Sequence, residues 1–157
     1  MKRDIALTNV SFNFLSKSSE FLNLVLNNIT SCILLLNKQM ELQAYNNCLT
    51  TIFSNSENEE KLYQKCGNAI GCAYLIEENK DCGETTFCNC CELRISAIES
   101  YLNDKPIFKE RITRPYYDKN NIKVIKHLQF STRLFLFDNE RYIIMIIDDI
   151  TNLCVKN

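Results

Sequence analysis

The sequence has few of the residues on which several common functions depend. It contains only three glycines and one histidine among 157 residues. Three glycines leave no phosphate-cradling glycine-rich loop, and no Ser/His/Asp set typical of a nucleophilic enzyme is recognisable. The longest apolar runs, residues 32–36 and 142–147, are far shorter than the roughly 20 residues that a membrane-spanning helix needs. We therefore expect neither an enzyme nor a membrane-spanning protein.

An excess of charge of one sign is also missing. The formal net charge is -1, and the scattered Lys and Arg residues do not form the basic patch of a nucleic-acid-binding protein. The first residues, MKRDIALTNVSFNF, lack the apolar segment of a secretion signal. An apolar content of 46% can form the core of one domain without disulfides. We predict a cytoplasmic protein whose cysteines are free or bound to metal.

Cysteine, by contrast, is abundant, with nine in the chain. Four of them, Cys72, Cys82, Cys88 and Cys91, are spread over the segment CAYLIEENKDCGETTFCNCC. Thiolates are the ligands that iron-sulfur clusters and zinc prefer, and four of them complete either site. The sequence therefore predicts one metal centre within a cysteine-rich segment, residues 66–91.

The spacing of these cysteines bears on the choice of metal. A four-cysteine zinc site usually has two close pairs, whereas here only Cys88 and Cys91 form one. The spacing argues against zinc, but from the residues alone a 4Fe-4S cluster and zinc both stay open. Cys66 and Cys90 lie close enough in the sequence to replace a proposed ligand. The other cysteines are assigned no metal-binding role: Cys32 and Cys48 as core residues and Cys154 as incidental.

Neighbouring residues suit the predicted site. Cys88 and Cys91 are three residues apart at a predicted helix start, capped by Thr85 or Thr86, where free amide groups stabilise thiolates. Gly83 allows the backbone to approach a bulky centre. Hydroxyl or amide groups of Thr85 and Thr86 could donate hydrogen bonds to sulfur.

Hydrophobic periodicity predicts the following elements. A helix begins near Ser19 with Ser18 or Ser19 as its cap, and Asn46-Asn47 cap a second, short helix. Two strands are expected at residues 32–36 and 40–45, a helical piece at 62–73, a strand around Phe108 and Ile112, a loop at 115–121, and strands at 122–137 and 142–147. The last strand is expected to be central and buried on both faces. The helix after the cysteines is expected to bury Cys91, Ile95, Ile98 and Leu102.

This order of elements resembles a PAS domain. The resemblance is carried by LLLNKQMELQAYNN, by YIIMIIDDIT with its terminal Asp149-Ile150-Thr151, and by the segments GNAIGC and CGETTFCNCC. The cysteine segments are similar to those of PAS domains in bacterial sensor histidine kinases and oxygen-responsive regulators. The resemblance implies an α+β fold: a five-stranded antiparallel sheet, helices inserted between strands 2 and 3, and an N-terminal helix. The domain would span residues 18–151, after an extension (1–17) and before a short tail (152–157).

The resemblance also implies a function. A cytoplasmic sensor would hold a 4Fe-4S cluster, respond to oxygen, nitric oxide or redox state, and pass the signal to a second copy or to a separate protein such as a histidine kinase. Phe135, Phe137 and Tyr142 would offer a partner surface, although the first helix could cover much of it. Two alternatives stay open: a zinc-stabilised interaction module and an iron-sulfur electron carrier. Haem at His127 is disfavoured, and flavin more so.

Overall fold

The fold is seen in a computed structural model that describes residues 19–53 and 61–154. The predicted extension (1–17), the cap Ser18 and the tail residues 155–157 lie outside the described residues. The elements are, in order, α2 (Ser19–Asn28), β1 (Cys32–Leu36), β2 (Leu42–Tyr45), α3 (Cys48–Ile52), α4 (Cys66–Ile70), α5 (Ala73–Glu78), the 3-10 turn η2 (Cys88–Cys90), α6 (Glu92–Asn103), β3 (Ile107–Tyr117), β4 (Lys123–Phe137), β5 (Glu140–Asp149) and α7 (Thr151–Cys154). Among these helices, none combines the length and apolar character needed to cross a membrane.

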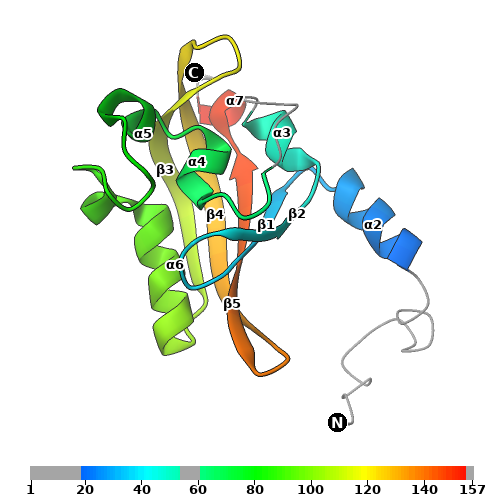
Figure 1. The fold of residues 1–157 in the computed structure, drawn as a ribbon. Helices are drawn as coiled ribbons and strands as arrows, with labels where there is room; N and C mark the ends of the chain where they lie inside the picture. The colour runs from blue at the N-terminus through cyan, green and yellow to red at the C-terminus, as the bar shows by residue number, and fades with distance from the viewer. Residues whose placement is uncertain (1–18, 54–60, 155–157) are drawn as a thin grey trace.

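A five-stranded antiparallel sheet forms the centre of the fold. Its strands lie in the order β2-β1-β5-β4-β3, so the first and last strands of the chain are neighbours. The helices α3, α4, α5 and α6 are inserted between β2 and β3, and α6 packs against β4 and β5 (Figure 1). This arrangement confirms the predicted α+β architecture.

Strand β5 shows where the core lies. It is central, as predicted, because it pairs with both β1 and β4. Ile143, Met145 and Ile147 are buried, whereas the alternate residues Ile144 and Ile146 are only half-buried. The prediction that both faces of β5 are buried is therefore wrong, because the inserted helices lie on one face of the sheet.

Helix α6 turns a different face to the sheet than the sequence predicted. Ile95 is 48% and Leu102 66% exposed. The buried residues are mostly small: Leu93, Ser96, Ala97 and Ser100. The Ser100 hydroxyl lies 2.7 Å from the Thr132 hydroxyl of β4 and donates to the Lys105 carbonyl at 2.7 Å. Small side chains allow close packing, and these hydrogen bonds satisfy the buried hydroxyls, so the less apolar face is the buried one.

Strand β3 is longer than predicted and contains an irregularity. It extends to Tyr117, into the predicted loop 115–121. Pro115 is tolerated because β3 is an edge strand. A register shift before Ile112 alters the side-chain alternation. As a result Phe108 is 60% exposed and Ile112 is buried, although both were expected on one face.

Helix α2 makes little contact with the rest of the described chain and projects away from the sheet (Figure 1). Its apolar residues stay exposed, with Leu24 at 57%, so it does not cover the strands as the sequence suggested. Asn46 holds its end: its amide group donates to the Leu26 carbonyl at 2.7 Å. Asn47 is the N-cap residue of α3, as predicted, but no side-chain cap bond forms there.

Candidate metal centre

A small cavity beside β3 collects the predicted site residues. Its volume is about 30 Å³. Five cysteines line it: Cys66, Cys72, Cys82, Cys88 and Cys91. The remaining wall consists of apolar side chains and of three residues with polar groups, Arg94, Arg114 and Tyr116. The structure thus brings the four predicted ligands to one place, and it adds Cys66.

The remaining cysteines lie elsewhere. Cys90 is exposed and does not line the cavity, so its position offers no support for it as a replacement ligand. Cys32 belongs to the main core and is fully buried, as predicted. Cys48 is half-buried, with its thiol donating to the Thr30 carbonyl at 2.9 Å. Cys154 lies in α7.

Two short helices and the edge strand position Cys72. The predicted helical piece 62–73 is divided into α4 and α5 by Gly71, whose φ of 75° ends α4 in the left-handed conformation. Cys72 follows as the N-cap of α5 and forms an isolated antiparallel bridge with Tyr116. The amide group of Tyr117 donates to the Gly71 carbonyl at 3.0 Å. Cys72 is thereby attached to β3.

Cys88 and Cys91 are not on one helical turn as predicted. Cys88 begins the separate turn η2, and Cys91 is the N-cap of α6 with extended backbone angles. The predicted caps Thr85 and Thr86 are therefore wrong, since α6 begins only at Glu92. Both residues still line the cavity, with the bend at Cys91 lying between η2 and α6.

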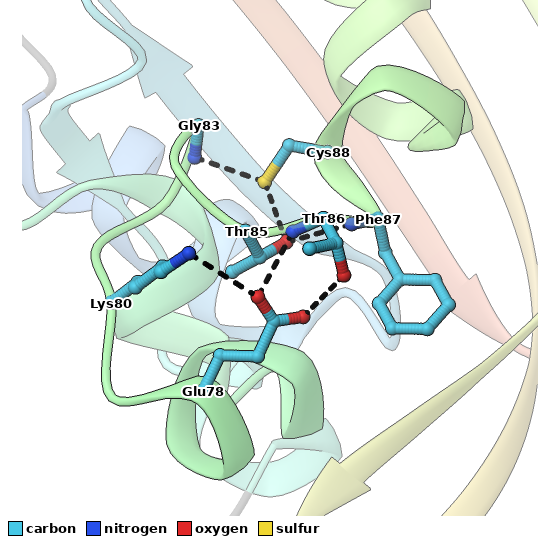
Figure 2. A network of polar contacts seen from close by, with 7 residues as sticks. All are labelled: Glu78, Lys80, Gly83, Thr85, Thr86, Phe87 and Cys88. Atoms are coloured by element: carbon cyan, nitrogen blue, oxygen red, sulfur yellow. Dashed lines mark hydrogen bonds and ion pairs between the residues drawn. The ribbon is translucent and has the colours of Figure 1, made fainter.

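The Cys88 sulfur has the polar neighbours that were predicted for a ligand. The amide group of Gly83 donates to it at 3.2 Å, and the Thr85 hydroxyl lies 3.0 Å away (Figure 2). Burial raises the pKa of the Cys88 thiol, but hydrogen bonds from Thr85 and Gly83 and the charge of Arg94 outweigh it and lower the pKa. Cys88 therefore forms a thiolate more readily than an ordinary cysteine.

Thr86 plays a different part from the one predicted. Its amide and hydroxyl groups donate to the Glu78 carboxylate at 3.0 and 2.7 Å, so they point away from the Cys88 sulfur (Figure 2). Lys80 lies 3.8 Å from the same carboxylate. Glu78 thus attaches the loop that carries Cys88 to the end of α5.

Two other thiols in the cavity have a raised pKa, in contrast to the lowered pKa of Cys88. Burial, followed by the nearby Cys82 and Cys91, raises the pKa of the Cys66 thiol well above its usual value. Burial also raises the pKa of the Cys82 thiol. Cys66 is fully enclosed, and its surroundings hold its thiol in the neutral form.

Basic residues that the sequence reasoning missed stand around the sulfurs. Arg114 places Nη2 3.8 Å from the Cys72 sulfur, and its guanidinium lies 5.1 Å from the centre of the Tyr74 ring. Arg94 contacts Gly83, where a Cβ atom would lie 2.9 Å from its Nη1 atom. Side-chain alternation along β3 places Arg114 on the same face as Ile112. This was missed because the sequence predicted a loop from residue 115 onward, whereas β3 extends to Tyr117.

The cavity offers five thiols, but the described residues contain no preformed single-ion site. Among residues 19–53 and 61–154, no three Cys, His, Asp or Glu side chains are grouped closely enough to hold one metal ion. Zinc needs its four sulfurs around one point, whereas a cluster takes one cysteine per iron and its ligands can stand further apart. A four-iron cluster is nevertheless larger than the cavity, so binding requires the loop side chains to move outward.

His127 and the terminal tripeptide lie apart from the cysteines. The His127 Nδ1 atom is 2.8 Å from the Thr113 hydroxyl, and its residue does not line the cavity. Asp149 accepts hydrogen bonds from Thr151 and pairs with Lys126 at 2.9 Å. These groups connect β4, β5 and α7, which is a structural role.

Comparison with known proteins supports the fold. No protein-family model and no curated protein matches the sequence. Among solved structures, the PAS domain of nitrogen regulation protein NR(II) from Vibrio parahaemolyticus is similar, with TM-score 0.57, 10% identity and coverage of 82% of this chain and 96% of that chain. The PAS domain of a Colwellia psychrerythraea protein has TM-score 0.57, 12% identity and coverage of 85% and 97%. The PAS domain of BvgS from Bordetella pertussis has TM-score 0.54, 14% identity and coverage of 84% and 85%. Similarity at such low sequence identity shows the fold alone. The chain therefore has the PAS fold.

Proposed function

We propose that this PAS-fold chain is a sensor that binds a 4Fe-4S cluster through Cys72, Cys82, Cys88 and Cys91. The observation that carries the proposal is the convergence of these four cysteines, separated by up to nineteen positions in sequence, on one cavity. The function is sensory rather than catalytic. When bound, a cluster supplies a redox-active group that oxygen, nitric oxide or a change in redox state can alter.

The charges around the cavity support a thiolate-bound centre. Four thiolates repel one another, and Arg94 and Arg114 place two cations beside them. The hydrogen bonds on Cys88 lower the pKa of its thiol and so favour the ligating form. Burial raises the pKa of the Cys66 thiol well above its usual value and so disfavours it as a ligand. This distinction favours the proposed set of four.

The chain itself provides a route from the site to a surface. Cys72 is attached to β3 and Cys91 begins α6, so the positions of these two sulfurs determine how residues 72–91 lie between strand and helix. Ligands held together would fix this segment, and ligands released would free it and α6 to shift. A ligand-dependent change in position is the behaviour required of a sensor.

The proposal includes a partner and a location. At the β4-β5 hairpin, Phe137 is 51% exposed and stacks on Phe135 with ring centres 6.2 Å apart, and Tyr142 lies beside them. This surface suits a second copy or a separate signalling protein such as a histidine kinase. All nine cysteines are free, which fits a reducing cytoplasm.

Anaerobic purification tests the cofactor. We expect a brown protein with an iron-sulfur absorption spectrum and equal amounts of iron and acid-labile sulfide. A colourless protein with stoichiometric zinc would replace the sensor with a zinc-stabilised interaction module. Reversible bleaching by a reductant, with an air-stable cluster and an unchanged fold, would favour an electron carrier.

Single Cys→Ser replacements test the ligands. We expect loss of the cluster in the Cys72, Cys82, Cys88 and Cys91 variants, and its retention when Cys66 is replaced. Cys90→Ser is the matched control, because this exposed cysteine neighbours two proposed ligands without lining the cavity. A complete cluster in the Cys88→Ser or Cys91→Ser protein contradicts the assignment.

A further inference from the structure

Two residues of β3 that line the cysteine cavity, Arg114 and Tyr116, each have a buried hydrogen-bond donor without an acceptor among the described residues. Tyr116 is 2% exposed, and its hydroxyl has no hydrogen-bond partner among the described residues. The Nε atom of Arg114 is also buried, and within the same residues it too lacks a partner. Buried polar groups are nearly always hydrogen-bonded, so two unpartnered donors at one cavity point to a bound group that accepts from them.

The backbone fixes both donors at this place. Residues 114 and 116 are two apart on a strand, so their side chains share the inner face with the buried Ile112. The bridge between Cys72 and Tyr116 attaches the strand to a proposed ligand. Stacking over the Tyr74 ring, at 5.1 Å, holds the guanidinium beside the Cys72 sulfur. The Arg114 guanidinium is thus already beside one sulfur, and Tyr116 lines the same cavity.

The chemistry of the site identifies the acceptor. A 4Fe-4S cluster with four thiolates is an anion, and its sulfurs accept hydrogen bonds that stabilise the more reduced, more negative state. We propose that Arg114 and Tyr116 donate hydrogen bonds to sulfur at this site and thereby raise its reduction potential. This inference rests on the proposed function, and the two residues act as positioning and tuning residues rather than as ligands.

The test compares Tyr116→Phe and Arg114→Gln with matched controls from the same strand. Tyr117→Phe removes a neighbouring hydroxyl that donates to Glu77 at 3.0 Å instead of facing the cavity. Arg111→Gln removes an exposed positive charge. Circular dichroism and urea unfolding establish that each variant folds.

The first measurement is the midpoint potential of the anaerobically reconstituted proteins, followed by optical redox titration. Loss of one hydrogen bond changes an equilibrium by roughly three- to tenfold. For a one-electron couple this is about 30 to 60 mV. We expect Tyr116→Phe and Arg114→Gln to move the potential to more negative values by this amount, with the controls unchanged. Equal potentials in all five proteins, with a complete cluster in each, would overturn the inference and leave the proposed function intact.

The second measurement uses Cd²⁺ alone, a redox-inert ion that also forms an anionic thiolate complex. Its affinity for the metal-free proteins is measured from the ultraviolet cadmium-thiolate band in competition with a chelator. We expect roughly three- to tenfold weaker binding in Tyr116→Phe and Arg114→Gln. If wild type takes up Cd²⁺ with this pattern but no iron or sulfide, the cluster proposal fails while the donor role stands. If it takes up neither, both fail.

Discussion

The unpartnered hydroxyl of Tyr116 predicts that, without metal, the Tyr116→Phe variant is more stable than the wild type. Burying a hydroxyl without a hydrogen bond costs roughly 1 to 3 kcal/mol. At 2% exposure the Tyr116 side chain cannot turn its hydroxyl to solvent. Replacing it by Phe removes that cost and leaves an oxygen-sized void, which costs only a few tenths of a kcal/mol at about 24 cal/mol per Å³.

We therefore expect Tyr116→Phe to raise the free energy of unfolding of the metal-free protein by about 1 kcal/mol. For a chain of this length, that corresponds to a rise in melting temperature of roughly 2 to 4 °C. The assay is urea unfolding followed by far-ultraviolet circular dichroism, with reductant and chelator present. Tyr117→Phe, whose hydroxyl is exposed to solvent and bonded to Glu77, should stay within about 0.5 kcal/mol of wild type.

The sign of the change in the free energy of unfolding decides whether the Tyr116 hydroxyl is unsatisfied in the metal-free protein. A decrease of 1 kcal/mol or more in Tyr116→Phe would mean that the hydroxyl makes a strong hydrogen bond in the metal-free state, and the reasoning from an unsatisfied donor would be refuted. With metal bound, the gain should shrink or reverse, because the hydroxyl then has an acceptor. The difference between the two states is a measure of the donor's contribution to binding.

Three further expectations follow from the loop and the helix that border the site. Gly83→Ala should destabilise the protein by roughly 1 to 3 kcal/mol in urea unfolding and weaken metal uptake, because φ is +97° and the new Cβ would lie 2.9 Å from Arg94 Nη1. Glu78 accepts from Thr86, first through its side chain, and this lowers the pKa of the carboxyl below its usual 4.5. The contact between Glu78 and Thr86 is therefore complete above pH 4.5 and is lost as pH falls through the lowered pKa. The amides of residues 81–87 should then lose protection against hydrogen exchange, measured relative to their intrinsic exchange rates. Glu78→Gln should abolish this pH dependence. Ser100→Val removes a buried hydroxyl that bonds both a β4 hydroxyl and a backbone carbonyl, and calorimetry should show a loss of roughly 1 to 3 kcal/mol.

The strands and the gathering of the cysteines were accessible from the sequence because each depends on local signals. Alternating or continuous apolar runs identified β1, β4 and β5. The cysteine spacing pointed to one site, and the structure places all four predicted ligands at one cavity.

The orientation of α6 was not accessible, because it depends on groups far apart in the sequence. Periodicity favoured the stripe with Ile95 and Leu102, the largest apolar residues. The sheet instead receives Ser96 and Ser100, because Thr132, thirty-two residues after Ser100, supplies a partner for the serine hydroxyl. A hydrophobicity pattern treats serine as a surface residue and carries no information about such a partner.

The donors at the site were missed for a related reason. Pro115 suggested a loop, and a loop gives no side-chain direction, so Arg114 and Tyr116 could not be assigned to a face. Proline is compatible with β3 only because this strand lies at the edge of the sheet. Edge position is a property of the whole topology, and it emerges only once the strand order is known.

The edge position of β3 also suits the proposed sensor site. One wall of the cavity is β3, which is hydrogen-bonded to β4. The opposite wall is a segment of short helices and loops, and it is held by isolated contacts such as the hydrogen bond from Thr86 to Glu78. Of the proposed ligands, Cys72 is bridged to Tyr116 of the rigid wall, whereas Cys82 and Cys88 lie in the weakly held segment. In the proposed sensor, a change in ligation would displace the weaker wall, because breaking the ladder between β3 and β4 would cost many hydrogen bonds. Cys91 is the N-cap of α6, so this displacement would also move α6. The face of α6 that packs on the sheet consists mostly of small residues with a few hydroxyl contacts. Such a face resists a shift less than large interlocking side chains would.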